Sequence, residues 1–562
     1  MASVYSLGCR HLSLVRNQAS ENPGRKNHLA ESVETAPFPS GLQTGRTAGI
    51  VGALMVLVSV VGYLREAALA ARFGVSTTMD AYFGAIFIPN ILYSILIAGT
   101  VSPILIPILV HEEAVANEAR RSEAFSVVST FSLVVLALII SLALPGAHLW
   151  LAWLFPGFSS ATLEMATRLV YIIFPSVIFL AVTGLLTAVL NGRHKFALAS
   201  FAPAFASAAV ILAAIFAHGN RAIYIVGIAT AVGFLVQCLV LVPAAASLGV
   251  RFRPIFNFRH PVIARLLRLG IPLFLYLAVA GASSVMERNL ASRLSAGAVS
   301  TLSYALRLFT VPANFMAAPL AIVAYPAFAR EAARVSRGEL GSQLSKIFRL
   351  VIFLFLPVTI WTVINSLVVT RLLYEHGRFL PADSVITAHV LAVYSMGILP
   401  NAVAMVLLRC FFAVEDTITP LFAEILALIS FVLLAPVLSR HFGLGGLVAA
   451  RAATFFLVTG ILVFVLAQRK ALLNLDRDLL KFLFRTLIAS AGMAALSWLT
   501  LRLLLGAFDS GGSVVRLLLT MMLLAIGGAV YLLLARLLNM AEARQIWSTI
   551  WAFLPSGNRG PQ

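Results

Sequence analysis

The sequence has few of the charged residues that a soluble protein of its length needs. Of its 562 residues only 11% are charged, whereas 60% are hydrophobic, and the mean hydropathy is +0.96. A soluble domain carries roughly 25% charged residues. The composition therefore excludes a soluble enzyme, a disordered protein and a secreted disulfide scaffold, and it indicates a membrane protein.

Cysteine is equally scarce, since Cys9, Cys238 and Cys410 are the only three. They lie far apart and do not form the paired spacing of a metal site. The chain also lacks the GxSxG, HExxH and P-loop motifs of common enzymes. The sequence therefore predicts no metal, no cofactor, no catalytic residue and no enzyme activity. Without a nucleotide site, energy for any work at the membrane would come from a monovalent-ion gradient, from the membrane potential or from substrate supply.

Acidic residues are half as frequent as basic ones, with 22 Asp and Glu against 41 Lys and Arg, which gives a net charge of +19. In a membrane protein such an excess marks cytoplasmic loops and not a nucleic-acid partner. The basic residues gather in alternate loops, around residues 120–121, 193–195, 251–268, 330–349 and 469–485. This alternation predicts an even number of spans with both termini in the cytoplasm.

Long hydrophobic runs fill most of the chain after residue 46. A helix needs about 20 apolar residues to cross a bilayer, and fourteen segments qualify. We therefore expect an all-α polytopic membrane protein. The polar residues 1–45 and 541–562 are predicted to be a disordered N-terminal tail and a C-terminal tail in the cytoplasm. The fourteen segments are residues 47–71, 80–110, 124–147, 162–190, 197–217, 222–247, 262–292, 298–328, 347–370, 384–412, 418–438, 444–467, 483–506 and 514–538.

An internal repeat relates residues 65–111 to residues 287–330. Each copy starts with a charged pair, continues through a short loop to a tyrosine, and has a proline inside the next span, Pro89 or Pro312. Six spans separate the copies, so both face the same way, as in transporters with parallel repeats. The repeat predicts two pseudo-symmetric six-helix lobes, 46–250 and 251–470, and leaves 471–540 as a C-terminal helix pair.

The two prolines are predicted hinges, because a proline-broken span can expose backbone to a cavity. A simple kink is the alternative.

Several charged residues interrupt the predicted spans. Because a charge inside a bilayer is costly, such residues face protein or water. Arg65, Arg288 and Arg307 are candidate contacts for an anionic headgroup, since a guanidinium binds phosphate through a planar set of donors. The structural alternative is ion pairing of Arg65 with Glu66 or Asp80 and of Arg288 with Glu287. Asp80 has a further alternative as a helix cap, and Glu164, Arg168, Glu424 and Arg451 are interpreted as structural.

Eight sequence motifs together resemble a known family, the MurJ/MviN lipid II flippases of the multidrug/oligosaccharidyl-lipid/polysaccharide exporter superfamily. The resemblance covers about residues 46–470. The motifs are GYLREAALAARFG (62–74), MDAYFGAIFIPN (79–90), FPGF (155–158), LNGRHKFALASFAP (190–203), ERNLASRL (287–294), LSYALRLFTVP (302–312), YEHGRFLPADS (374–384) and RCFFAVEDTITP (409–420).

The resemblance implies the same fourteen helices, a central cavity between the lobes, and a groove for the polyprenyl tail beside the last two helices. It also implies a function, alternating-access transport of the undecaprenyl-pyrophosphate-linked peptidoglycan precursor from the cytoplasmic to the periplasmic leaflet of the bacterial inner membrane. Its partners would be this lipid and the surrounding membrane lipids. The positions that match family cavity residues are Arg65, Asp80, Ser300 and Arg307, and Arg288 completes the predicted substrate-binding set.

The chain departs from the family pattern at several cavity positions. Ser59 replaces a frequent arginine, Phe87 and Tyr93 replace basic residues, Ala98 replaces an acid, and Thr310 replaces a glutamate. A flippase for another polyprenyl-linked oligosaccharide, such as an exopolysaccharide or O-antigen intermediate, would keep the architecture and change these residues. It is therefore the leading alternative.

Three further alternatives belong to other functional classes. A cation-coupled drug exporter of the same superfamily would favour buried carboxylates over arginines. A membrane-embedded glycan polymerase or acyltransferase would need a catalytic acid or histidine on a long outer loop, whereas the longest such loop here is about 371–383. A non-transporting scaffold would tolerate substitution of the arginines.

Overall fold

The computed structural model consists of helices and short loops, with no strand in the part of the chain that it describes. Two units, residues 1–55 and 56–562, are each described by themselves. The first contributes only residues 41–55 of a helix, and the account below concerns the second. The described residues are 41–101, 105, 118–193, 195–248, 252–317, 320, 328, 337–414, 416–469, 472–473, 476–510 and 512–544.

The first half of the described fold runs from the first helix to residue 248. In it α4 packs against α8, and α12 packs against α9 and α11. The chain reverses direction at short loops, and Gly74 adopts a positive φ of 63° between the first two helices. The helices are α3 (Gly41–Phe73), α4 (Thr77–Tyr93), η1 (Ser94–Val101), α6 (Glu118–Ala143), α7 (Ala147–Leu154), α8 (Ser160–Ile173), η2 (Phe174–Ser176), α9 (Val177–Gly192), α10 (Phe196–Phe201), α11 (Pro203–Phe216) and α12 (Ala222–Ala246).

The second half covers residues 252–473. Here α13 packs against α19, and α14 packs against α17. The helix α19 is broken by non-helical backbone at Gly443, so it accounts for two of the predicted spans. The helices are α13 (Pro261–Ser292), α14 (Ala298–Pro312), η3 (Ala313–Ala317), α16 (Arg337–Tyr374), α17 (Pro381–Ser395), α18 (Ile398–Ala413), α19 (Ile418–Phe464) and η4 (Val465–Arg469).

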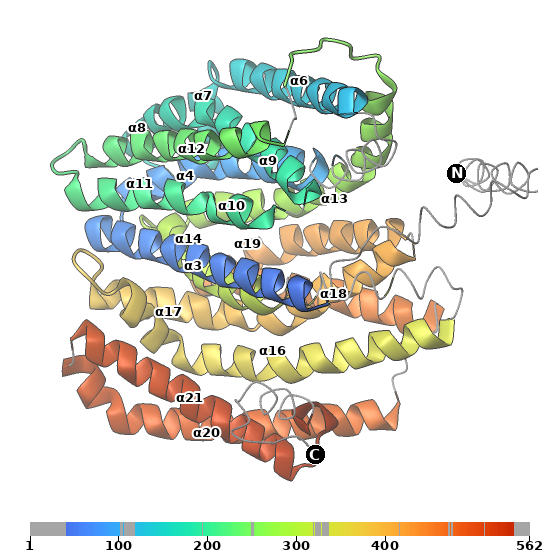
Figure 1. Cartoon of the computed structure of the whole chain (residues 1–562). Helices are drawn as coiled ribbons and strands as arrows, with labels where there is room; N and C mark the ends of the chain where they lie inside the picture. Colours follow the sequence, from blue (N-terminus) through green and yellow to red (C-terminus); the bar gives the residue numbers. More distant parts are fainter. Residues whose placement is uncertain are drawn as a thin grey trace, which may run out of the picture. The chain divides into compact units, whose positions relative to one another are not determined.

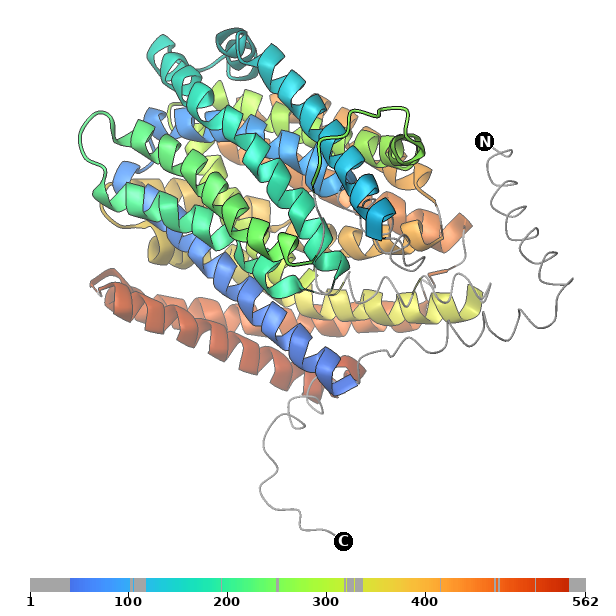
Figure 2. The same cartoon turned by 45° about the horizontal axis from the view of Figure 1, so that its top comes forward.

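A helix pair ends the described chain. Helices α20 (Arg477–Ser510) and α21 (Ser513–Leu537) pack against each other, and both pack against α16 of the second half. Figures 1 and 2 show the pair in red beside the yellow α16. The C-terminal helix pair expected from the repeat is therefore present.

The predicted spans agree with the helices within the described residues, whereas most of 102–110 and of 318–328, at the ends of two predicted spans, lies outside them. Ten described helices are long and apolar enough to cross a membrane, or twelve when each of two bent pairs counts as one span. The broken α19 is one of the ten, and α14 lies where a further span was expected. The expected N-terminal tail overlaps α3 at residues 41–45, because the helix begins earlier than its apolar stretch. Residues 1–40 and 545–562 of the expected tails lie outside the described residues.

The internal repeat is visible in the local geometry of its two copies. Helix α4 contains Pro89 and continues into the π-helix η1, and α14 ends at Pro312 and continues into the π-helix η3. A π-helix is rare and frequently marks a functional site. Both predicted hinge prolines thus precede an irregular helical segment.

Large apolar side chains cover the outer surface of the helices. Leu149, Trp153, Phe216 and Leu503 each expose more than 70% of their area. Exposure of so many large apolar side chains to water would be energetically unfavourable. Contact with lipid tails would not be, because the tails are as apolar as these side chains. The exposed surface therefore indicates a multi-pass membrane protein.

Candidate functional site

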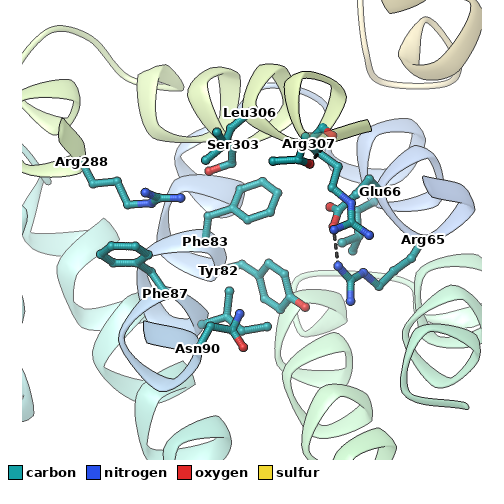
Figure 3. A pocket seen from close by; sticks show the side chains of 13 residues that line it. Arg65, Glu66, Tyr82, Phe83, Phe87, Asn90, Arg288, Ser303, Leu306 and Arg307 are labelled. Carbon is teal, nitrogen blue, oxygen red and sulfur yellow. Dashed lines mark hydrogen bonds and ion pairs between the residues drawn. The ribbon is translucent and has the colours of Figure 1, made fainter. Parts of the chain in front are cut away.

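A cavity of about 260 Å³ with charged and aromatic side chains in its wall lies between the two halves of the fold, and we call it the arginine cavity. Helices α3 and α4 line it from the first half, and α13 and α14 line it from the second. It contains Arg65, Arg288 and Arg307, three of the five predicted substrate-binding residues, and Figure 3 shows their side chains around one space. Its full lining is Arg65, Glu66, Leu69, Tyr82, Phe83, Ile86, Phe87, Asn90, Arg288, Ser303, Leu306, Arg307 and Thr310.

Arg65 forms an ion pair with its chain neighbour Glu66, whose Oε1 lies 2.5 Å from Arg65 Nη2. Of the two structural partners expected for Arg65, the structure therefore selects Glu66 and not Asp80. The Glu66 side chain is buried, and its second oxygen, Oε2, has no hydrogen-bond partner.

Arg307 reaches across the cavity from α14 to α3. Its Cζ lies 5.1 Å from the centre of the Tyr63 ring, which is within the range of a cation–π contact. Gly62 has no side chain at the point where the guanidinium approaches the helix, and a Cβ there would collide with Arg307 Nη2. The Nε of Arg307 is buried without a hydrogen-bond partner. Gly62 and Tyr63 thus hold a guanidinium that forms no ion pair with a carboxylate among the described residues.

Arg288 lies against the opposite wall, with its Cζ 3.9 Å from the centre of the Phe87 ring. Its Nη1 donates a long hydrogen bond of 3.5 Å to the Ser284 carbonyl, and its Nε has no partner. Glu287 directs its carboxylate elsewhere and accepts a hydrogen bond from the Tyr394 hydroxyl at 3.3 Å. The alternative ion pair between Arg288 and Glu287 does not form in the described structure, where the Glu287 carboxylate bonds to Tyr394 and attracts the Arg288 guanidinium only from a longer distance.

The charge balance of the arginine cavity follows from these contacts. Three arginines and one glutamate line it, so its side chains carry a net charge of +2. Only Arg65 has a carboxylate partner in the cavity lining. An uncompensated charge away from water is unfavourable, and an anion with two negative charges would balance it.

Asp80 and Ser300 lie outside this lining and bind each other between the two halves. The Gly297 and Ser300 amides donate to Asp80 Oδ2 and Oδ1 at 2.6 and 2.7 Å. Gly297 is the N-cap residue of α14 and has no side chain to accept the amide of Ser300. Asp80, which is 3% exposed, supplies that acceptor from α4. Asp80 is not the cap of its own helix, since Ser76 is the N-cap residue of α4. It caps the start of α14 in the other half instead.

Further contacts close the same end of the interface. The Arg378 amide donates to the Ala71 carbonyl at 2.8 Å, and the Tyr304 hydroxyl donates to the Gly74 carbonyl at 3.4 Å. The rings of Phe83 and Tyr304 meet edge to face with their centres 5.3 Å apart. We call this set of contacts, together with those of Asp80, the clamp. It joins the halves at the loops that follow α3 and α13.

A second, larger cavity adjoins the first half, the second half and the C-terminal helix pair. It measures about 780 Å³, and its lining is almost entirely apolar, so we call it the apolar groove. It is lined by Val60, Tyr63, Leu64 and Ala67 of α3, Leu308, Val311 and Pro312 of α14, Met316 of η3, Phe353, Leu354, Pro357, Val358, Trp361, Thr362, Val369, Leu372 and Leu373 of α16, Met493 of α20, and Leu517, Thr520, Met521, Leu524, Gly528, Tyr531 and Leu532 of α21.

Helices α3 and α14 separate the two cavities. On α3 one face presents Arg65 and Glu66 to the arginine cavity, and the other presents Tyr63 and Ala67 to the apolar groove. On α14 Arg307 lines the first cavity and the next residue lines the second. A molecule with a charged end and a long apolar end would therefore occupy both cavities by passing between these helices.

The groove-lining residues of α3 escaped the sequence analysis, although a signal was present. Residues 60, 63, 64 and 67 follow the i, i+3, i+4, i+7 spacing of one helix face. In a span that is apolar all round, this spacing does not show which face lines a cavity.

Two groups interpreted as structural lie outside both cavities. Arg168 and Glu164 form an exposed ion pair on α8. Arg451 lies 5.2 Å from the Phe455 ring centre, within the second half.

Comparison with known proteins gives consistent results. The family model for the lipid II flippase MurJ matches residues 69–523. A probable lipid II flippase MurJ from Vibrio cholerae serotype O1 is 29% identical over 464 residues, which are 80% of this chain and 88% of that protein. The lipid II flippase MurJ of Burkholderia cenocepacia is 28% identical over 381 residues, covering 66% and 73%.

Solved structures show the same fold. A lipid II flippase MurJ in an inward closed conformation superposes with a TM-score of 0.73 at 21% identity, covering 87% of this chain and 98% of that one. An inward-facing multidrug resistance MATE family transporter of the MOP superfamily gives a TM-score of 0.61 at 14% identity, covering 75% and 98%.

Proposed function

Because the chain belongs to the lipid II flippase MurJ family, we propose that it moves lipid II from the cytoplasmic to the periplasmic leaflet of the inner membrane. Lipid II is the undecaprenyl-pyrophosphate-linked precursor of peptidoglycan, so the activity serves cell-wall synthesis. The relatives named above support this assignment. Transport makes and breaks no covalent bond, and the arginine cavity is lined by no histidine or cysteine.

The observation that carries the proposal is the pairing of a cationic cavity with an apolar groove. The diphosphate of lipid II is a diester with two negative charges, which equals in size the net charge of +2 in the arginine cavity. Arg65, Arg288 and Arg307 approach the cavity from three helices, so a diphosphate between them would accept hydrogen bonds from several sides. Arg307 and Arg288 are the strongest candidates, because neither forms an ion pair with a carboxylate of the cavity lining.

The polyprenyl tail would occupy the apolar groove while the headgroup occupies the arginine cavity. Tyr63 belongs to the groove lining and also contacts Arg307, so it stands where the tail joins the diphosphate. This arrangement keeps the tail in apolar surroundings throughout transport. Only the headgroup then needs a polar path across the bilayer.

Alternating access would use the clamp. We place the clamp on the periplasmic side, because the loops that carry it hold few basic residues and the opposite loops hold many. Both termini are then cytoplasmic. In this assignment Asp80 and Ser300 hold the outer side closed until the headgroup is loaded, and the residues after Pro89 and Pro312 bend as the halves move.

The membrane potential is the energy source that fits the charge of the substrate. Moving one charge across 100 mV is worth about 2.3 kcal/mol. A headgroup with two negative charges that moves outward across an inside-negative membrane would gain about twice that amount. No bound ion is required in this account.

The leading alternative is transport of another polyprenyl-linked oligosaccharide. The aromatic residues Tyr82, Phe83 and Phe87 form part of the cavity wall. Aromatic faces bind sugar rings of many kinds, whereas the diphosphate and tail are common to both substrates. The saccharide is therefore what distinguishes the two functions.

The test is a leaflet-specific assay of lipid II in a flippase-depleted strain that expresses this chain. The parent should restore lipid II to the periplasmic leaflet, and Arg307→Ala should not. Arg168→Ala, which removes an exposed arginine, is the matched control and should behave as the parent. All variants should reach the membrane in equal amounts. Restoration by Arg307→Ala would contradict the proposed site, and failure of the parent together with transport of an O-antigen lipid would favour the alternative.

A further inference from the structure

One short loop touches the clamp and the C-terminal helix pair at once. Residues 375–380 connect α16 to α17, and we call them the 375–380 loop. The loop belongs to the second half of the fold, and its residue Arg378 contributes one of the clamp contacts. Its contacts extend to the first half and to α21.

The contact with the clamp is made by backbone and by an aromatic ring. The Arg378 amide donates to the Ala71 carbonyl at the end of α3. The Phe379 ring meets the Tyr304 ring edge to face, with their centres 5.6 Å apart. Tyr304 in turn contacts Gly74 of the first half. A displacement of this loop would therefore disturb the clamp.

The contact with the helix pair is made by charged and polar side chains. Glu375 Oε1 lies 3.2 Å from Arg516 Nη1 of α21, and Glu375 Oε2 lies 3.3 Å from Arg371 Nε of α16. All three side chains are less than 20% exposed. His376 Nε2 lies 3.0 Å from Ser513 Oγ at the start of α21. Partly buried ion pairs of this kind depend on geometry more than exposed pairs do.

The ion pair stands directly beside the apolar groove. Leu517, which follows Arg516, lines the groove, and so do Leu372 and Leu373, which precede Glu375. A chain lying in the groove would press on the two segments that the ion pair connects. Occupancy of the groove and the position of the 375–380 loop are therefore mechanically linked.

We propose that Glu375 is a positioning residue that makes release of the clamp depend on occupancy of the apolar groove. This inference rests on the proposed function, because it takes the polyprenyl tail as the occupant. A tail in the groove shifts α21 against α16. The Glu375–Arg516 pair transmits this shift to the 375–380 loop. The contacts of Arg378 with Ala71 and of Phe379 with Tyr304 are then weakened. The clamp would then open for a loaded transporter and stay closed for an empty one.

The test measures how fast a cysteine at the clamp reacts. Val75→Cys is introduced beside Gly297, in a full-length chain in which Cys9, Cys238 and Cys410 are changed to alanine. Labelling by a membrane-impermeant maleimide is followed in proteoliposomes without ligand, with undecaprenol, which has the tail alone, and with inorganic pyrophosphate. A benzophenone-tagged undecaprenol, photo-crosslinked and mapped, reports groove binding separately.

Undecaprenol should raise the labelling rate about threefold or more in the parent, and Glu375→Gln should abolish this rise while crosslinking in the groove persists. Any response to pyrophosphate should be the same in both. Glu164→Gln is the matched control, since it removes a carboxylate from an exposed i,i+4 ion pair and should keep the parent response.

Three outcomes would overturn the inference. The first is an equal response of Glu375→Gln and the parent to undecaprenol, and the second is crosslinking in the parent without a change in labelling. Both leave the proposed function standing. Absence of crosslinking to the groove would instead refute the tail-binding part of the proposed function, and the inference would fail with it.

Discussion

Substitution of Asp80 by asparagine should open the clamp with little change in side-chain volume. The carboxylate accepts two short backbone hydrogen bonds, from Gly297 at 2.6 Å and from Ser300 at 2.7 Å. An asparagine amide has one acceptor oxygen, so its NH₂ group must face one of these two N–H donors. One bond is thereby lost, and the other becomes a bond between neutral groups.

The size of the effect follows from the strength of such bonds. A hydrogen bond to a charged group contributes about 1.5–3 kcal/mol, and a neutral one about half of that. The clamped state of Asp80→Asn should therefore lose about 2–4 kcal/mol relative to the open state. Since 1.4 kcal/mol corresponds to a factor of ten, the open fraction should rise by about 30-fold to several hundred-fold.

The labelling rate of Val75→Cys in proteoliposomes without ligand is proportional to this open fraction when the clamp is mostly closed and opens and closes faster than the maleimide reacts. Asp476→Asn is the matched control, because Asp476 caps α20 locally through the Leu479 amide and joins no two halves. The control should label as slowly as the parent. If Asp80→Asn also labels at the parent rate while the fold is intact, the two backbone bonds do not hold the clamp, and the reasoning is refuted.

Three further predictions concern the two cavities. Gly62→Ala should push the Arg307 guanidinium away from α3 and weaken pyrophosphate binding severalfold in a calorimetric titration, while the melting temperature stays near that of the parent. Arg288→Lys should weaken pyrophosphate binding by about 3- to 30-fold, because an ammonium offers no planar set of donors and loses part of the cation–π contact with Phe87; unchanged affinity would remove Arg288 from the site. Gly528→Trp should fill open space in the apolar groove and weaken undecaprenyl phosphate binding without affecting free pyrophosphate, whereas Gly460→Trp on α19, where a Cβ also meets no atom, should affect neither.

The arginines of the site could be predicted from the sequence, because a charged side chain inside a membrane span has an unfavourable free energy unless it faces protein or water. Arg65, Arg288 and Arg307 stood out against apolar surroundings, and the structure brings all three to one cavity. The spans themselves were predictable for the same reason, since hydrophobic length depends on local composition alone. Whether these arginines hold the substrate stays a prediction.

Apart from the local pair of Arg65 and Glu66, the partners of the cavity and clamp residues could not be predicted, because they depend on side-chain direction and on distant chain segments. Glu287 and Arg288 are adjacent in sequence, yet one faces Tyr394 and the other faces the cavity. Asp80 bonds to residues 217 and 220 positions away. No local pattern encodes that pairing. The apolar groove is equally nonlocal, since five segments of the chain build its wall.

The two hydrogen bonds from α14 to Asp80 have a consequence for how the sequence can vary during evolution. Its two donors are main-chain amides, which every residue except proline provides. The α14 side of the contact can therefore change its side chains over evolutionary time and keep both bonds, whereas the acidic partner cannot be replaced. Covariation between the two positions would then be weak, and a contact central to the working cycle would leave little trace in compared sequences beyond one invariant aspartate.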